Sequence, residues 1–298
     1  MKRRNLFIGI GIVTLIAITV VFSLITKTEP VPLETVPTPS EATSTPVAFS
    51  RKSIIGASVE GRSIEAFTYG HGDTHVLFVG GMHGGYEWNS VLLAYEFMDY
   101  LDAHPEFIPE TMTIAVIPSA NPDGLFSVIG KEGQLTFEDV PTTPNTSGKG
   151  RFNAHNVDLN RNFDCKWQPE STWRGNVVSA GTSPFSEPES VALRDFVTTY
   201  SPSAVVFWHS QAGAVYASEC LEGILPTTRT IMDAYGLASG YDAVSTFDAY
   251  PITGDAEGWL ASINIPAITV ELETRNNIEW TRNLDGISAI LKTLIAPL

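Results

Sequence analysis

Four stretches of the sequence combine residues that bind metals, hold charge or move protons. In the first, His83 and Glu87 follow glycines just after the apolar run that ends at Val79. Glycines there allow a sharp turn, and an imidazole and a carboxylate are common zinc ligands. In the second, His209 closes the apolar run Ala204–Trp208. Two histidines and one carboxylate would leave a fourth zinc position open for water, although a solvated His-Glu pair and a core histidine are alternatives.

The third and fourth stretches offer anion-binding and proton-accepting groups. Arg151, Asn160 and Arg161 lie close together in the chain. Two arginines and an asparagine can hold a carboxylate and donate to a developing oxyanion. Glu271 ends the β-branched run that begins at Ala267, and a glutamate beside a metal can act as a general base. An arginine paired with one of the many acids, and an ordinary acid at a strand end, remain alternatives.

Strands that alternate with helices are expected to position these groups. Runs rich in β-branched residues predict strands at 54–59, 64–69, 75–79, 111–117, 204–208, 214–217 and 267–271. Helical patterns cover 90–103, 187–200, 228–238 and 277–295. This alternation favours an α/β fold with a mixed central sheet and helices on both faces, an α/β/α sandwich. Ligands bind such sheets at the carboxyl ends of strands, where both histidines fall. Residues 126–151 show little periodicity and are expected to form a functional or loosely ordered loop.

The composition excludes several classes of protein. The chain has 298 residues, of which 43% are hydrophobic and 17% charged, so it is expected to fold. Its 33 acidic against 18 basic residues give a net charge of −15, which argues against nucleic-acid binding. Two cysteines allow one disulfide at most and cannot form a four-thiolate zinc site. A serine hydrolase is disfavoured because no G-x-S-x-G motif occurs.

The amino terminus predicts a membrane anchor. Bases at Lys2, Arg3 and Arg4 precede the uncharged run Leu6–Ile25, which would span about 30 Å as a helix. We therefore expect residues 1–25 to form one transmembrane signal-anchor, with a cleaved signal peptide as the alternative. The preceding bases indicate a single-pass protein whose catalytic domain lies outside the cytoplasm. Residues 26–50, rich in proline and threonine, are expected to form a linker to one domain at 51–298.

Taken in chain order, these stretches resemble the zinc carboxypeptidase family, typified by carboxypeptidase A, and look like its compact bacterial members. The resemblance covers about residues 52–297 and rests on 81–87, 121–124, 157–163, 184–189, 209–210 and 269–272. It implies one zinc ion per chain, held by His83, Glu87 and His209. The family usually has two residues between the first two ligands, whereas this sequence has three. Glu87 remains the expected ligand because glycines can absorb an extra residue.

The resemblance also implies roles for the other candidates. Glu271 would be the general base and Arg151 an oxyanion donor, although the gap from Arg151 to Asn160 is shorter than in the digestive enzymes. Asn160 and Arg161 would clamp the terminal carboxylate of the substrate. Tyr250 resembles the tyrosine of a mobile loop that closes over that carboxylate.

Further matches concern specificity and the backbone. Glu257 falls where the family places the residue at the bottom of the side-chain pocket. An acid there would favour a basic last residue, and Asp255 is a second acid nearby. A non-proline cis peptide is common in the family's stretch equivalent to 207–211. Outside the cytoplasm a Cys165–Cys220 disulfide is expected because both segments should lie beside the site, two free thiols being the alternative.

The sequence therefore predicts a zinc metallocarboxypeptidase that removes the last residue of a peptide, with a preference for a basic one. The expected partners are a peptide substrate and, through residues 1–25, a membrane; the protein is expected to be a monomer. One alternative is a cell-wall peptide amidase of the γ-D-glutamyl-diaminopimelate type, or a deacylase, on the same fold. A non-catalytic surface binding module is another, although the retained Glu271 argues against it.

Overall fold

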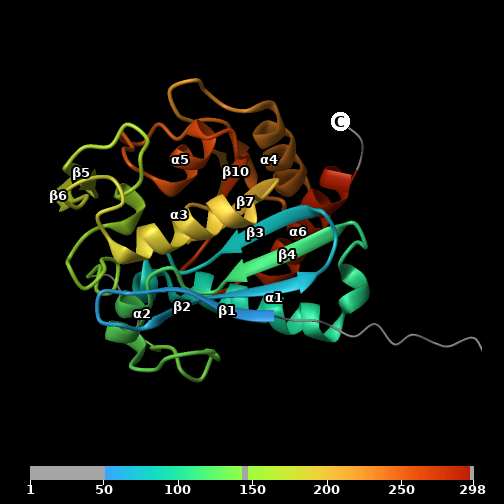
Figure 1. Cartoon of the computed structure of the whole chain (residues 1–298), viewed down its shortest axis with the longest axis horizontal. Coiled ribbons are helices and arrows are strands. Elements are labelled where there is room, and N and C mark those ends of the chain that lie inside the picture. The colour runs from blue at the N-terminus through green and yellow to red at the C-terminus, as the bar shows by residue number, and fades with distance from the viewer. Residues whose placement is uncertain (1–50, 143–146, 296–298) are drawn as a thin grey trace, which may run out of the picture. The chain divides into compact units, whose positions relative to one another are not determined.

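The computed structural model describes residues 51–142 and 147–295 (Figure 1). Its main sheet has eight strands in the order β1-β2-β4-β3-β7-β10-β8-β9. They are β1 (Arg51–Ala57), β2 (Ser63–Gly70), β3 (Thr74–Val79), β4 (Met112–Ile117), β7 (Ala204–Ser210), β8 (Ala214–Ala217), β9 (Asp242–Val244) and β10 (Ala267–Leu272). A separate two-stranded sheet consists of β5 (Glu170–Trp173) and β6 (Asn176–Ser179). The helices are α1 (Trp88–Ala103), α2 (Pro122–Ile129), α3 (Pro188–Tyr200), α4 (Pro226–Ser239), α5 (Ala256–Ser262) and α6 (Trp280–Ile295), with 3₁₀ turns η1 (Gly84–Glu87), η2 (Pro105–Phe107) and η3 (Leu159–Arg161).

The centre of the main sheet is parallel, and on each side an antiparallel pair joins it to the outer strands. Strands β4, β3, β7 and β10 run parallel, whereas β1, β2 and β8 pair antiparallel with their inner neighbours. Every residue of β4 and β7 is buried, as expected for strands covered on both faces. The predicted mixed sheet is therefore confirmed.

Two separate hydrophobic cores lie on the two faces of this sheet. Alternate side chains of β3 and β7 divide between them, Phe78 and Trp208 joining one core and Leu77 and Phe207 the other. Buried residues of α1, α4 and α6 belong to the first core, and those of α3 and α5 to the second. Helices α1 and α3 accordingly lie on opposite sides of the sheet in Figure 1. This arrangement confirms the three-layer α/β/α prediction.

The predicted strands and helices are confirmed to within a few residues at each end, but one loop was predicted too long. Residues 126–129 belong to α2, so the irregular stretch begins at Gly130 and not at residue 126. The helix begins where the Asn121 side chain accepts a hydrogen bond from the Gly124 backbone N–H at 2.9 Å, with Pro122 in the first turn. Helices α2 and α5, strand β9 and the β5-β6 hairpin had no predicted counterpart.

The predicted anchor and linker, residues 1–25 and 26–50, lie outside the described residues. Among the residues that are described, no helix is both long and apolar enough to cross a bilayer.

Candidate active site

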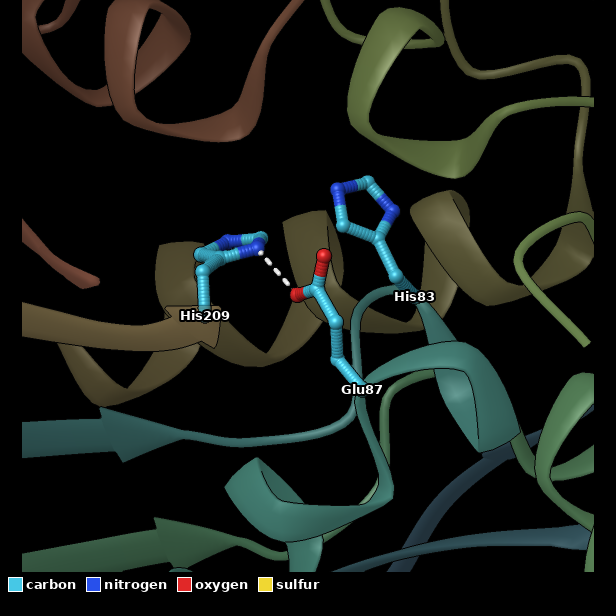
Figure 2. A group of neighbouring side chains, drawn as sticks. All are labelled: His83, Glu87 and His209. Carbon is cyan, nitrogen blue, oxygen red and sulfur yellow. Dashed lines mark hydrogen bonds and ion pairs between the residues drawn. The ribbon is translucent and has the colours of Figure 1, made fainter. Parts of the chain in front are cut away.

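Three predicted zinc ligands come together at the carboxyl ends of adjacent parallel strands. His83 follows β3, Glu87 ends η1, and His209 lies in β7, the neighbour of β3. Their ligand atoms all lie within 4.8 Å of one another, and all three side chains are buried. Glu87 Oε2 lies 3.1 Å from His209 Nδ1, and a dashed line marks this contact in Figure 2. Neighbouring parallel strands end at one edge of a sheet, which explains why residues so far apart in sequence meet here.

The glycines before Glu87 explain how the extra residue between the first two ligands is accommodated. Gly84 has a φ of +46°, and a Cβ placed on it would lie 2.6 Å from the Gly150 carbonyl oxygen. Only glycine therefore fits this turn. The 3₁₀ turn η1 then brings Glu87 back towards the histidines, so the unusual spacing still yields a convergent group.

A buried acid that the sequence did not single out organises this region. Asp158 is fully buried, and its Oδ2 accepts hydrogen bonds from Arg151 Nε at 3.0 Å and Nη2 at 2.8 Å. Its Oδ1 lies 3.7 Å from His83 Nδ1. Asp158 therefore joins an expected metal ligand to the expected oxyanion donor. Its position between two apolar residues, Val157 and Leu159, was the available signal.

The two histidines experience opposite electrostatic surroundings. Burial, followed by the positive charge of Arg151, lowers the pKa of His83. Burial also opposes protonation of His209, but the carboxylates of Glu257 and Glu87 outweigh it and raise the pKa of His209. Excess negative charge therefore surrounds His209, and this charge favours a bound cation.

The donor set fits zinc. Two imidazoles and one carboxylate are the nitrogen and oxygen ligands that catalytic zinc sites use, with one position left for water or substrate. His83 Nδ1 is a buried ring nitrogen without a hydrogen bond in the described chain, and His209 turns its Nδ1 towards Glu87 while its Nε2 faces Glu257. Since buried polar atoms normally have partners, this group is best explained by a bound ion.

Glu271 lies beside the ligands on β10, where it is in register with His209 of β7. Its Oε2 is buried and has no hydrogen-bond partner among the described residues. Burial and then the negative charge of Glu87 raise the pKa of Glu271 to about 7. A carboxylate with such a pKa can accept a proton near neutral pH.

Arg161 is a buried cation without an acidic partner in the part of the chain that the structure describes. It is 2% exposed, its Nη1 donates to the Asn160 carbonyl at 2.6 Å, and its Nε has no partner. Asn160 in turn accepts a hydrogen bond at Oδ1 from the Ala256 N–H at 2.9 Å, which ties η3 to α5. Arg151, by contrast, is already paired with Asp158.

Two acids lie on and before α5. Glu257 Oε1 lies 3.3 Å from His209 Nε2 and accepts a hydrogen bond from Thr269 Oγ1 at 3.1 Å. Asp255 caps the helix by accepting from the Gly258 N–H at 2.7 Å. Burial, and then the charge of Glu257, raise the pKa of Asp255 to about 6.

One cavity of about 730 Å³ contains all of these groups. Its lining includes every residue that the sequence predicted for the site, namely His83, Glu87, Arg151, Asn160, Arg161, His209, Tyr250, Asp255, Glu257 and Glu271. Tyr250 is half-buried, with its ring 4.8 Å from that of Phe247. Tyr86, Trp173, Arg174 and Arg275 also line the cavity, although the sequence did not single them out.

Two backbone features beside the cavity were expected. Cys165, which lines it, forms a disulfide with Cys220, so the predicted bridge is confirmed. The peptide bond between Ser210 and Gln211 is cis, within the stretch where one was expected.

An α/β/α sandwich with a buried His-Glu-His group, a nearby carboxylate and a buried arginine defines a metal-dependent hydrolase. The family model described as zinc carboxypeptidase matches residues 42–286, and the chain belongs to this family. The chain is 25% identical over 244 residues to γ-D-glutamyl-L-diamino acid endopeptidase 1 of Lysinibacillus sphaericus, covering 75% of this chain and 60% of that protein. It is 27% identical over 191 residues to mouse carboxypeptidase M, covering 60% of this chain and 37% of that protein. The matches thus cover less than two thirds of the length of each of these two relatives.

A solved structure supports the same fold. Bovine thrombin-activatable fibrinolysis inhibitor matches with a TM-score of 0.66 and 18% identity, covering 83% of this chain and 90% of that chain. At this identity the likeness concerns the fold alone.

Proposed function

We propose that this protein is a zinc-dependent peptidase that removes the last residue of its substrate. The observation that carries the proposal is Arg161, a buried guanidinium without an acidic partner in the described chain, in the same cavity as Glu271 and the ligand group. An unpaired buried charge is costly, so a substrate anion is its natural partner. A terminal carboxylate held there would leave the preceding amide bond beside the ligand group.

Each residue of the cavity has a separate role in the proposed hydrolysis. His83, Glu87 and His209 would hold zinc, which supplies Lewis-acid polarisation and lowers the pKa of water. Glu271 accepts the proton of the attacking water at its unpartnered Oε2 and can return it to the leaving amine. Arg151 keeps Nη1 for the developing oxyanion because Asp158 engages its Nε and Nη2.

The acids of α5 favour a last residue with a second amino group. Glu257 and Asp255 both line the cavity, where their negative charge would attract an ammonium group. Tyr250 lies on the loop before α5 and is our candidate to cover the bound substrate.

A second candidate reaction is hydrolysis of a γ-D-glutamyl-diamino acid bond in a cell-wall peptide. The similarity to the Lysinibacillus endopeptidase, which extends over 75% of this chain, favours it. The acidic pocket fits it equally well, because a diamino acid also carries a second amine. In both candidate reactions the released residue carries a second amine. The two reactions differ in the residue that donates the acyl group.

Mass spectrometry of the zinc-loaded full-length chain tests the proposal. Peptides ending in Lys, in Leu and in Lys-amide would be compared with a tripeptide that ends in γ-D-glutamyl-diaminopimelate. We expect release of Lys ahead of Leu and little from the amide. Release from the amide equal to that from the acid would contradict the role of Arg161, and no release from any peptide, despite stoichiometric zinc, would contradict the peptidase itself.

We also propose that the protein is anchored by residues 1–25 as a single-pass protein, with a monomeric catalytic domain outside the cytoplasm. The Cys165–Cys220 disulfide supports this location because such bonds persist in oxidising compartments. Digestion of the domain by protease added to intact cells would test it, and protection of the domain would contradict it.

A further inference from the structure

An aromatic pair and two arginines form a second cationic corner of the cavity. The Tyr86 and Trp173 rings lie 5.3 Å apart, edge to face. Arg275 Cζ lies 4.1 Å from the Tyr86 ring centre, and Arg174 Cζ lies 5.5 Å from that of Trp173. All four residues line the cavity. We call this group the Arg275 corner.

The Arg275 corner contains polar atoms that the described chain leaves unpartnered. Both Arg275 Nε and the Tyr86 hydroxyl are buried without a hydrogen bond in the described chain, and Arg275 forms no ion pair there, whereas Arg174 is exposed to solvent. Acids were available in a chain with 33 of them. The nearest in sequence, Glu273, is instead bound to Arg282 at 2.9 Å. Since buried donors normally find partners, the corner lacks an anion that a ligand would supply.

Arg151 shows which part of a substrate would reach this corner. Its guanidinium carbon lies 4.6 Å from the Trp173 ring centre, and its Nη1 lies 3.8 Å from Glu87 Oε1. A carbonyl oxygen stabilised by Arg151 would therefore place its own residue beside the aromatic pair. Arg161 packs elsewhere, on the segment joined to α5. Arg161 and the Arg275 corner would therefore face opposite sides of the cleaved bond. Arg161 would face the residue that is released, and the Arg275 corner the residue before it.

We propose that Arg275, assisted by Arg174 and the Tyr86 hydroxyl, binds a free carboxylate on the residue that donates the acyl group. The substrates would be peptides with an acidic residue just before the one released. That carboxylate could be the side chain of an α-linked glutamate or the α-carboxylate of a γ-linked glutamyl residue. This inference rests on the proposed function and narrows its substrate class.

Matched pairs of peptides that all end in Lys test this subsite. One pair has α-linked Glu or Gln before the Lys, and the other has γ-linked D-Glu or its α-amide. With the zinc-loaded full-length chain, we expect kcat/KM for the carboxylate to exceed that for its matched amide by about tenfold in at least one pair. Whichever pair shows the larger ratio identifies the linkage.

Substitutions test whether the Arg275 corner causes this ratio of kcat/KM between carboxylate and amide peptides. Arg275→Gln should bring it towards one, Arg275→Lys should keep part of it, and Tyr86→Phe should lower it by about threefold. Arg229→Gln is the matched control, because Arg229 is exposed on α4 and does not line the cavity, and it should leave the ratio unchanged. Circular dichroism would verify that each variant is folded.

The outcomes separate this subsite from the proposed function. Equal kcat/KM within both pairs, or a ratio that survives Arg275→Gln, would overturn the subsite and leave the peptidase intact. If no peptide is cleaved, the proposed peptidase activity is contradicted. The carboxylate subsite can then still be tested by calorimetric binding of the same peptides to the zinc-loaded Glu271→Gln chain. Tenfold tighter binding of a carboxylate peptide that depends on Arg275 would support the subsite, and equal binding would overturn it.

Discussion

The two sides of the cavity are held by different means. The strand-end group is His83, Glu87, His209 and Glu271. His209 and Glu271 lie in β7 and β10, and the turn after the neighbouring parallel strand β3 carries His83 and Glu87. The loop group, residues 151–174 and 250–257 together with Arg275, lies outside the main sheet and is held by polar contacts and a disulfide. Under the proposed function, the sheet would therefore position the metal ligands and the general base, and the loops would supply most of the groups that bind the substrate. Each substitution below should affect one group and spare the other.

The largest effect is expected from Glu271→Gln in the strand-end group. Removing the proton acceptor should lower kcat by about 10²–10⁴-fold, because general bases contribute that much. Zinc content should remain stoichiometric, since the three ligands are untouched. Steady-state assays on a Lys-ending peptide would measure kcat, and metal analysis of the same sample would measure its zinc content.

Arg229→Gln, outside the cavity, is the control for expression and folding. If Glu271→Gln kept more than a tenth of the wild-type kcat, Glu271 would not be the base. If it lost zinc as well, the strand-end group would not be an independent unit.

The disulfide should matter for the stability of the loop group. It closes a separation of 55 residues between Cys165 and Cys220. Chain-entropy arithmetic for such a loop gives about 4 kcal/mol, and measured values are commonly 2–4. The double variant Cys165→Ser/Cys220→Ser should therefore lose about 3 kcal/mol of unfolding free energy in urea titrations.

Zinc affinity measured by chelator competition distinguishes local from global effects of that variant. It should change little, because neither cysteine is one of the three ligand residues. A loss of zinc affinity as large as the loss of stability would show that the two groups unfold together.

A smaller effect is expected from Arg161→Gln in the loop group. Losing a charge-assisted contact to the terminal carboxylate should lower kcat/KM by about 10–100-fold, mostly through KM. Steady-state kinetics on a Lys-ending peptide would measure it. A peptide amidated at its carboxyl terminus is the control, because it offers no carboxylate and should be cleaved equally slowly by both enzymes. An equal loss on both peptides would mean that Arg161 supports the fold only.

The sequence alone indicated which residues of the strand-end group would come together, and all four line the same cavity. Buried parallel strands read as continuous apolar runs, and the first polar residue after each run marks its carboxyl end. His83, His209 and Glu271 could be recognised in this way, and the family resemblance ordered them. The three-residue spacing to Glu87 became understandable only with η1, whose tight turn depends on contacts with Gly150 far along the chain.

The loop group was predicted less completely, because its contacts join distant segments. Asp158 reveals its role only when Arg151 and His83 are seen on either side of it. Arg174 and Gly175 form the turn of the β5-β6 hairpin, with φ of +52° and +78°. Positive φ values at both positions suit a two-residue hairpin turn, and the glycine was the only local signal. Arg275 could not be connected to Tyr86 from sequence at all.

The smallest expected effect is a pH dependence of specificity within the loop group. The pKa of Asp255 is raised to about 6, so this carboxyl is mostly neutral at pH 5 and ionised at pH 7.5. A lysine side chain stays protonated across that range. The attraction between the two should therefore grow as pH rises, and the ratio of kcat/KM for Lys-ending over Leu-ending peptides should increase by about fivefold, or about 1 kcal/mol. Dividing by the Leu value removes the pH dependence that both substrates share through Glu271.

Asp255→Asn should make the ratio independent of pH while keeping α5 capped, since asparagine is also a good helix N-cap. A ratio that rises equally in Asp255→Asn would assign the pH dependence to another group, and a ratio that falls with pH would mean that no acid of α5 faces the substrate's ammonium.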